Sequence, residues 1–348
     1  MNNQLKPIKY KKAYEDIITN QITVWMWTNI FQECFAILKN DTIMNDSSII
    51  RDAIIRGVIR YENDAFYSNT HIGIKLAQEL EAIGARYSKS RKAWVIARSK
   101  LTPQIIWAIE TVDAKTFAKI QAIKGFLDYQ LANIDKILAK LTFDTAVKSI
   151  MTDLQKRVYA NAKAHKIELI TPKIDDFTAD EIAKNYTNNL EFWIKDWTEE
   201  EIIKMRSIVG TMSIEGKSIR TIEDYLTKEF GISQRKARFL ARNESAIAST
   251  SYLVAKYQAE GFTSFIWHTN IDGRERPLHK ELNGHTFRFD NPPIIDERTG
   301  EKGLPSQTYN CRCSFSPVAD KEWFENRKKL FMKKNSLFGK IKNALHIA

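Results

Sequence analysis

Two cysteines lie one residue apart near the C-terminal end of the sequence, within the segment TYNCRCSFSPV. Cys311 and Cys313 are two of the three cysteines in this chain of 348 residues. Thiolates and imidazoles are ligands that suit Zn²⁺, so Cys311, Cys313 and His279 are candidate ligands of a structural zinc ion. A small segment rich in Gly and Pro gains stability from such a metal.

The sequence leaves the zinc hypothesis open, because the fourth ligand is not obvious. His285 and His268 are the two candidates for that position. The alternative is that both thiols are small buried groups that pack without a metal. From the sequence alone we favour packing, because neither the Cys-x-Cys spacing nor the ligand count decides for zinc.

Acid–base chemistry is a second hypothesis for the same segment. His279 with Asp272 would make a metal-dependent enzyme that processes nucleic acid, such as a nuclease. We favour instead a structural network in which arginines pair with carboxylates and carbonyl groups, because no Asp/Glu cluster of the kind found in metal nucleases is present. The predicted network consists of Arg242, Glu244, Trp267, Asp272, Arg274, Arg276, His279, Gly284 and Arg312.

The net charge of +11 predicts a polyanionic partner, and much of the excess lies at the C-terminal end. Residues 321–348 carry eight Lys and Arg against two Glu, interleaved with apolar residues at helical spacing. Such a helix can bind DNA phosphates non-specifically, a membrane surface or a partner groove, or it can pack on its own protein. The candidate DNA contacts are Arg327, Lys328, Lys329, Lys333, Lys334, Lys340 and Lys342.

The composition also bounds the class of protein. Three cysteines cannot form a disulfide framework, so a reducing compartment suits the chain. No secretory signal is visible, and no run of 18 uncharged apolar residues exists, so we expect no transmembrane segment.

Hydrophobic periodicity predicts a predominantly α-helical α+β fold. Helical spacing dominates up to Gly261, interrupted by a short β-hairpin after Gly84, and small irregular β structure follows over residues 262–318. The predicted division is a mainly helical N-terminal region over 1–200, a small α+β domain over 201–318 and a basic amphipathic tail over 319–348.

Local signals predict where several helices begin and end. Thr102 with Pro103 is a helix start, and Thr198 followed by three glutamates is another. Gly84, Gly231 and Gly261 are predicted helix ends.

The order of unusual residues in the second half resembles that of the phage Mu protein F-like head morphogenesis proteins, the minor head proteins of tailed bacteriophages. The resemblance covers about residues 203–318. Its motif positions are Ala237, Ala241, Arg242, Asn243, Glu244, Gly261, Trp267, Asp272, Arg274, Arg276, His279, Leu282, Gly284, Pro292, Pro293, Asn310, Cys311, Arg312 and Cys313. Asn243 stands where the family usually has Thr.

The resemblance implies a minor capsid protein that acts in head assembly and in DNA packaging or ejection. It implies the portal protein, capsid proteins and double-stranded DNA as partners. The expected location is the virion, in the head interior or at the portal vertex, and the host cytoplasm during assembly. It implies no established catalytic residue. A prophage protein that reuses the domain for delivery is a further alternative.

Overall fold

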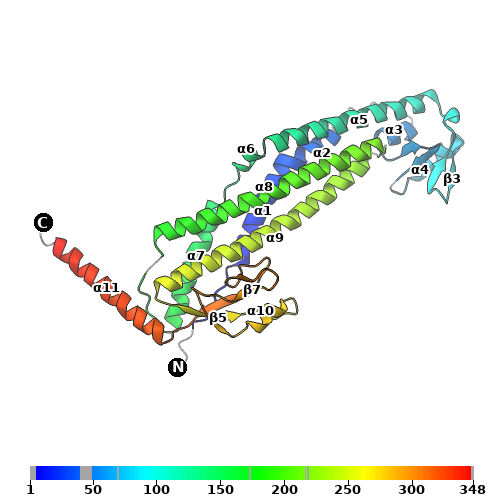
Figure 1. Ribbon diagram of the computed structural model, residues 1–348. Helices are drawn as coiled ribbons and strands as arrows, with labels where there is room; N and C mark the ends of the chain where they lie inside the picture. Colours follow the sequence, from blue (N-terminus) through cyan, green and yellow to red (C-terminus); the bar gives the residue numbers. More distant parts are fainter. Residues whose placement is uncertain are drawn as a thin grey trace. The chain divides into compact units, whose positions relative to one another are not determined.

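A computed structural model describes residues 5–39, 49–68, 70–171, 174–215, 217 and 219–345 (Figure 1). Contacts divide the chain into two compact units made of separated segments. The first unit comprises Met1–Ile22, Leu141–Trp193 and Lys236–Ala348, and the second comprises Thr23–Lys140 and Ile194–Arg235. The predicted fold class, a predominantly helical α+β protein, is confirmed. The division into three consecutive segments stays a prediction.

The second unit holds a four-stranded antiparallel sheet in the order β1-β2-β4-β3. Its strands are β1 (Arg60–Glu62), β2 (Ala65–Tyr67), β3 (Arg86–Ser88) and β4 (Ala93–Val95). Its helices include the end of α1 (Lys12–Met26), a π-helical turn (Trp27–Phe31), α2 (Gln32–Lys39), α3 (Ile49–Ile55), α4 (Ile74–Ala82), a 3₁₀ turn (Arg98–Lys100), α5 (Pro103–Ala132) and α6 (Ile134–Leu138). Ile54, Phe66, Leu80 and Ile105 belong to one buried apolar core shared by the sheet and its helices.

Two local predictions in this unit are confirmed. The hairpin after Gly84 is β3 and β4, paired with Tyr87 opposite Trp94. Thr102 caps α5, since its side chain accepts a hydrogen bond from the Ile105 N–H at 3.4 Å, and Pro103 is the first helical residue.

Two predicted helix boundaries are wrong. Thr198 lies inside α8 (Asp176–Ile214), and Gly231 lies inside α9 (Ile219–Ala259). Thr198 is buried, and its hydroxyl donates to the Met26 sulfur at 3.6 Å instead of capping a helix. A glycine costs about 1 kcal/mol in a helix. In α9 this cost is offset by packing of the helix on both sides of Gly231, where Leu226 and Ala237 are fully buried.

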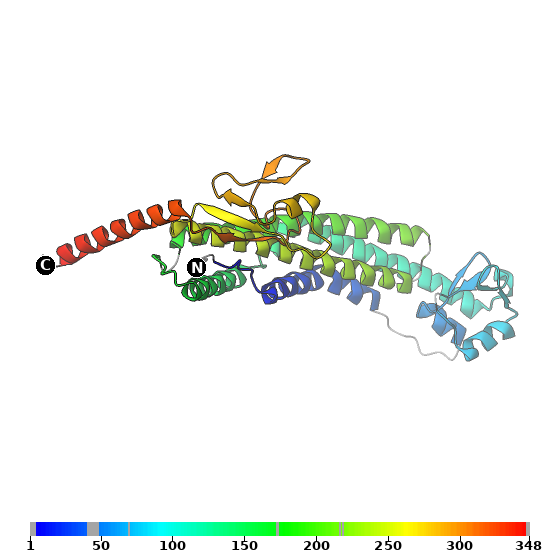
Figure 2. The same ribbon diagram turned by 90° about the horizontal axis from the view of Figure 1, so that it is seen from below.

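The first unit combines helices with two small sheets. Its helices are α7 (Asp144–Ala164), the adjoining parts of α1, α8 and α9, α10 (Pro277–Glu281) and α11 (Lys321–Leu345). One sheet has the order β6-β5-β9, formed by β6 (Thr286–Arg288), β5 (Ser264–His268) and β9 (Ser314–Pro317), and the other pairs β7 (Ile294–Asp296) with β8 (Glu301–Lys302). Figures 1 and 2 show β5 beside the C-terminal part of α9. Tyr257 of α9 packs edge-on against Phe315 of β9, the strand paired with β5, with ring centroids 6.0 Å apart.

Gly261 ends α9 as predicted. It has a φ of +85°, and the Phe262 N–H donates to the Tyr257 carbonyl at 3.0 Å while the Gly261 N–H donates to the Gln258 carbonyl at 2.9 Å. This pattern of two reverse hydrogen bonds satisfies carbonyls at the helix end and turns the chain toward β5.

No helix in the described part of the chain has the length and apolar character needed to cross a membrane.

Candidate metal centre and the base of the tail helix

His279 lies on α10 and is buried, with 2% of its surface exposed. Its helix begins at Pro277, directly after Arg276, which is extended. The His279 ring packs edge-on against the fully buried Trp267 ring of β5, with centroids 5.3 Å apart. The strand therefore fixes where the imidazole lies.

The structure brings His279 together with both cysteines. The Nδ1 atom of His279 lies 3.5 Å from the Cys311 sulfur and 3.5 Å from the Cys313 sulfur. All three side chains are buried, and their ligand atoms lie within 4.8 Å of one another. The group can therefore present one nitrogen and two sulfurs to a single ion.

Neither predicted fourth ligand belongs to this group among the described residues. The Nε2 atom of His268 lies 2.7 Å from the Ser316 hydroxyl. His285 also lies outside the group, and its backbone carbonyl accepts from the Trp267 N–H at 3.0 Å.

The other nitrogen of His279 defines the protonation of the ring. Nε2 lies 3.1 Å from the carbonyl oxygen of Ile295. A carbonyl oxygen only accepts hydrogen bonds, so Nε2 carries a hydrogen and Nδ1 is the atom that faces the sulfurs. Metal-binding histidines commonly donate their second N–H to a carbonyl in this way.

The pKa values of the two thiols are shifted in opposite directions. The hydrogen bond with Cys313, assisted by His279, lowers the pKa of Cys311, although burial opposes the charged form. The same hydrogen bond and burial raise the pKa of Cys313. Burial disfavours the charged imidazole, but the hydrogen bond and charge of Cys311 outweigh it, so the pKa of His279 is raised. A thiolate, the form of cysteine that binds metals, is thus favoured at Cys311.

Asp272 forms a fork with Arg312, the residue between the two cysteines. Arg312 Nη2 donates to one carboxylate oxygen at 2.8 Å, and Nη1 donates to the other. Arg274 adds a side-chain hydrogen bond at 3.0 Å. The Arg312 hydrogen bonds hold the pKa of Asp272 well below its usual range. Asp272 and His279 have separate partners, so this geometry does not favour an acid–base pair between them.

Two further network residues shape the loops around the cluster. Arg276 donates to the Thr308 hydroxyl at 3.3 Å and to the Tyr309 carbonyl at 2.6 Å, which joins α10 to the segment before Cys311. Gly284 has a φ of +80°, and its N–H donates to the Trp267 carbonyl at 2.8 Å. A residue with a side chain is strained at that φ.

Arg242 and Glu244 have different partners. Arg242 pairs with Glu15, its Nε lying 3.4 Å from a carboxylate oxygen, and its carbonyl accepts from the Tyr10 hydroxyl at 3.2 Å. Glu244 is buried and accepts from the Asn243 side chain at 2.9 Å, and burial raises its pKa. The sequence did not reveal the contribution of Tyr10 or Glu15, which lie more than 220 residues away along the chain.

Asn243 connects α9 to the cysteine segment. Its side-chain oxygen accepts from the Asn310 N–H at 3.0 Å. Asn310, the residue before Cys311, has a φ of +54°, a conformation that Asn adopts more readily than most residues. The Asn-Cys-Arg-Cys order could have indicated this turn.

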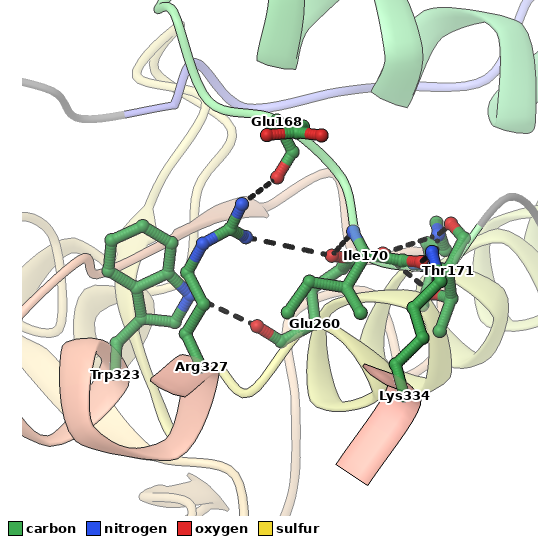
Figure 3. Close-up of polar contacts among 8 residues, drawn as sticks. Glu168, Ile170, Thr171, Glu260, Trp323, Arg327 and Lys334 are labelled. Atoms are coloured by element: carbon green, nitrogen blue, oxygen red, sulfur yellow. Dashed lines mark hydrogen bonds and ion pairs between the residues drawn. The ribbon is translucent and has the colours of Figure 1, made fainter. Parts of the chain in front are cut away.

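Glu260 forms a buried hub at the base of the tail helix, shown in Figure 3. Its carboxylate accepts from the Ile170 N–H at 2.6 Å, and from the Thr171 N–H at 2.9 Å and hydroxyl at 2.6 Å. Lys256, also fully buried, donates to it at 2.9 Å. Burial alone would raise the pKa of Glu260, but the hydrogen bonds from Thr171, Lys256 and Ile170 outweigh it, so the pKa is lowered.

The first turns of α11 attach to this hub. The Trp323 indole N–H donates to the Glu260 carbonyl at 3.1 Å, and Arg327 stacks over the Trp323 ring at 5.3 Å (Figure 3). Arg327 donates to the Glu168 carbonyl, and Lys334 donates to the Ile170 carbonyl at 2.8 Å. Two of the seven predicted DNA contacts therefore hold the helix in place.

The other predicted DNA contacts differ in how far the structure describes them. Lys328, Lys329 and Lys333 are exposed. The side chains of Lys340 and Lys342 lie outside the described part of the chain. Sequence reasoning missed Lys256 and Glu260, whose four-residue spacing on a helix was the available signal.

Comparison with known proteins agrees with the motif. Residues 205–316 match the model of the family described as Phage Mu protein F like protein, which confirms the resemblance for this segment. A protein of Haemophilus influenzae, described as an uncharacterized protein, is 24% identical over 151 residues. That match covers 43% of this chain and 30% of the relative's length. No solved structure matches the chain.

Proposed function

We propose that this chain is a minor head protein of a tailed bacteriophage. It acts in head morphogenesis at the portal vertex or the inner capsid surface, with the portal protein and capsid proteins as partners. The family match over residues 205–316 is the observation that carries the proposal. The network of motif residues supports it, since His279, Cys311, Arg312 and Asp272 are joined in one small domain.

The finer part of the proposal is that α11 contacts packaged DNA during packaging or ejection. Helical spacing places Lys329 and Lys333 on one side of α11, and Arg327 with Lys334 on the opposite side, where they attach the helix. The exposed Lys329 and Lys333 are free to neutralise phosphates without loosening that attachment. Such contacts are non-specific, and they weaken as the salt concentration rises.

Quantitative mass spectrometry of salt-washed phage particles tests the head role. The chain is counted against the major capsid protein in the same particles. We expect a few copies per particle. Absence of the chain from purified particles would reject the virion role.

DNA binding is tested with the double variant Lys329→Glu and Lys333→Glu. We expect the log–log salt dependence of binding to double-stranded DNA to lose about two units of slope, because two phosphate contacts disappear. The matched control is Lys75→Glu with Lys89→Glu, which makes the same charge change at two exposed lysines elsewhere. Equal weakening in both variants would show a general charge effect and contradict a specific role of α11.

A further inference from the structure

We propose that His279 Nδ1 and the sulfurs of Cys311 and Cys313 bind one Zn²⁺ ion, and that the fourth coordination position of this ion opens onto an adjoining cavity and holds an exchangeable solvent ligand. This inference concerns the residues of the small domain and holds whether or not the chain acts in a phage head.

The spacing of the three ligand atoms fits a tetrahedral zinc ion. With Zn–S near 2.3 Å and Zn–N near 2.0–2.1 Å, tetrahedral angles place a sulfur and a nitrogen about 3.6 Å apart. Both sulfur-to-Nδ1 distances are 3.5 Å. An ion therefore fits between the three atoms with little movement of the chain.

Hydrogen bonding alone leaves this arrangement incompletely explained. Nδ1 of a neutral imidazole has one lone pair, and Nδ1 of a protonated imidazole has one hydrogen. In either state Nδ1 can form a good hydrogen bond with only one sulfur, whereas the sulfurs of Cys311 and Cys313 both lie 3.5 Å from it. A central cation interacts with all three atoms at once.

The residues around the cluster hold the ligands in place. His279 donates its second N–H to the Ile295 carbonyl, which orients the ring. The Cys313 N–H points to the Cys311 sulfur at 3.5 Å, and the Ser306 hydroxyl donates to the Cys313 carbonyl at 2.8 Å. The Arg312–Asp272 fork fixes the residue between the two cysteines.

The fourth position follows from what surrounds the three ligands. No further His, Cys, Asp or Glu of the described residues joins the group, and Asp272 is engaged by Arg312 and Arg274. A cavity of about 200 Å³ is lined by all three ligands. It is large enough for several water molecules. Three protein ligands with one open position is the arrangement that lets zinc exchange a ligand with solvent.

Metal analysis of the full-length chain tests the ligand set. The protein is purified without a metal-binding tag and dialysed, and its zinc is counted by mass spectrometry. We expect one zinc per chain in the wild type and none in the double variant Cys311→Ser with Cys313→Ser. The matched control is Cys34→Ser, which removes the third buried cysteine and should leave the zinc content unchanged. A wild type without zinc that also fails to take up added Zn²⁺, or a double variant that keeps its zinc, would overturn the proposal.

Cobalt replacement in the wild-type chain tests the open position, and it does not depend on whether a variant folds. We expect a thiolate-to-cobalt charge-transfer band and visible bands with the intensity of four-coordinate cobalt. Addition of azide should shift the visible bands, because azide replaces the solvent ligand. Absence of a charge-transfer band would contradict thiolate ligation. Bands that do not respond to azide would show that the fourth position is closed.

Discussion

The two units contain small antiparallel sheets of similar size that are stabilised by different means. The sheet β1-β2-β4-β3 lies in an apolar core that includes Phe66, Leu80 and Ile105. The sheet β6-β5-β9 also has aromatic contacts, such as Phe265 stacked on Phe289 at 5.1 Å. The loops that surround it, however, are held by the His–Cys cluster and by Arg–Asp pairing, and the Glu260 hub holds α11, which follows β9.

This difference follows from the elements that flank each sheet and from their composition. The first sheet is flanked by α3, α4 and α5, which supply apolar side chains. The loops after β5 contain one short helix, α10, and many polar residues, so few apolar contacts are available to order them. Buried polar groups order such loops only when each has partners. Mutations should therefore destabilise the region around the sheet β1-β2-β4-β3 by creating cavities. They should destabilise the region around the sheet β6-β5-β9 by removing polar partners.

The largest expected effect is that of Phe66→Ala in the apolar core. Phe66 is 1% exposed, and its ring contacts that of Tyr61 at 5.1 Å. The cavity should lower the free energy of unfolding of this region by about 4 kcal/mol. Hydrogen exchange of peptides from residues 60–101 and 262–318, together with urea denaturation, measures where the loss falls.

Tyr87→Ala is the control for this prediction, because Tyr87 lies in the same sheet and is 54% exposed. We expect Tyr87→Ala to lower the free energy of unfolding much less than Phe66→Ala. Equal loss of protection in peptides of both sheets after Phe66→Ala would contradict independent stabilisation of the two regions.

A somewhat smaller effect is expected for Glu260→Gln in the polar region. The substitution leaves the buried Lys256 ammonium without its carboxylate. Breaking a buried ion pair by removing one partner should cost about 3 kcal/mol. Protection should fall in peptides from residues 168–171 and 321–334, which measure the attachment of α11. Glu322→Gln removes one of the two exposed carboxylates that pair with Arg288 and should change little. An equally small change for Glu260→Gln would show that the hub does not hold α11.

The hub should also make this attachment sensitive to acid. Because the folded-state pKa of Glu260 lies below its ordinary value near 4.3, its stabilisation is complete above that value and is lost as pH falls through the folded-state pKa. Between about pH 5 and pH 3, protection of α11 should decline more steeply in the wild type than in Glu260→Gln. Parallel pH profiles would contradict this assignment.

The smallest expected effects come from the same substitution at two similar helix ends. Gly84 has a φ of +92°, and the Ala85 N–H donates to the Leu80 carbonyl at 2.9 Å, the arrangement also found at Gly261. Alanine at such a φ should cost about 1–2 kcal/mol. At Gly84 an added Cβ meets nothing within 4 Å. At Gly261 it would lie 3.3 Å from the Arg327 backbone nitrogen and 3.3 Å from Leu330 Cδ1.

Gly261→Ala should therefore cost more than Gly84→Ala, and the excess should appear as lost protection in α11. Urea denaturation gives the two costs, and hydrogen exchange locates them. Equal costs with α11 unaffected would mean that the helix shifts to make room, and would contradict tight packing on Gly261.

Much of the local structure was predictable because it depends on neighbours in sequence. The Thr102 cap, Pro103 at the first helical position and the glycine stops at Gly84 and Gly261 each use one or two hydrogen bonds within a few residues. The predictions at Thr198 and Gly231 failed because packing against residues distant in sequence keeps α8 and α9 helical through both positions. The local signals there predict a helix boundary only when tertiary packing is left out.

The sequence by itself determined the helical α+β class, the strand after Gly261 and the motif residues of the Mu F-like segment, because periodicity, turn chemistry and spacing are local properties. Only the tertiary structure decided which side chains meet. It placed Cys311 and Cys313 around one imidazole nitrogen, and it left His268 and His285 outside the cluster. It also showed that Arg327 and Lys334 attach α11 through backbone carbonyls, unlike Lys329 and Lys333 on the opposite side of the helix. Such pairings join residues dozens to more than a hundred positions apart, and a contact over that separation depends on how the whole chain packs.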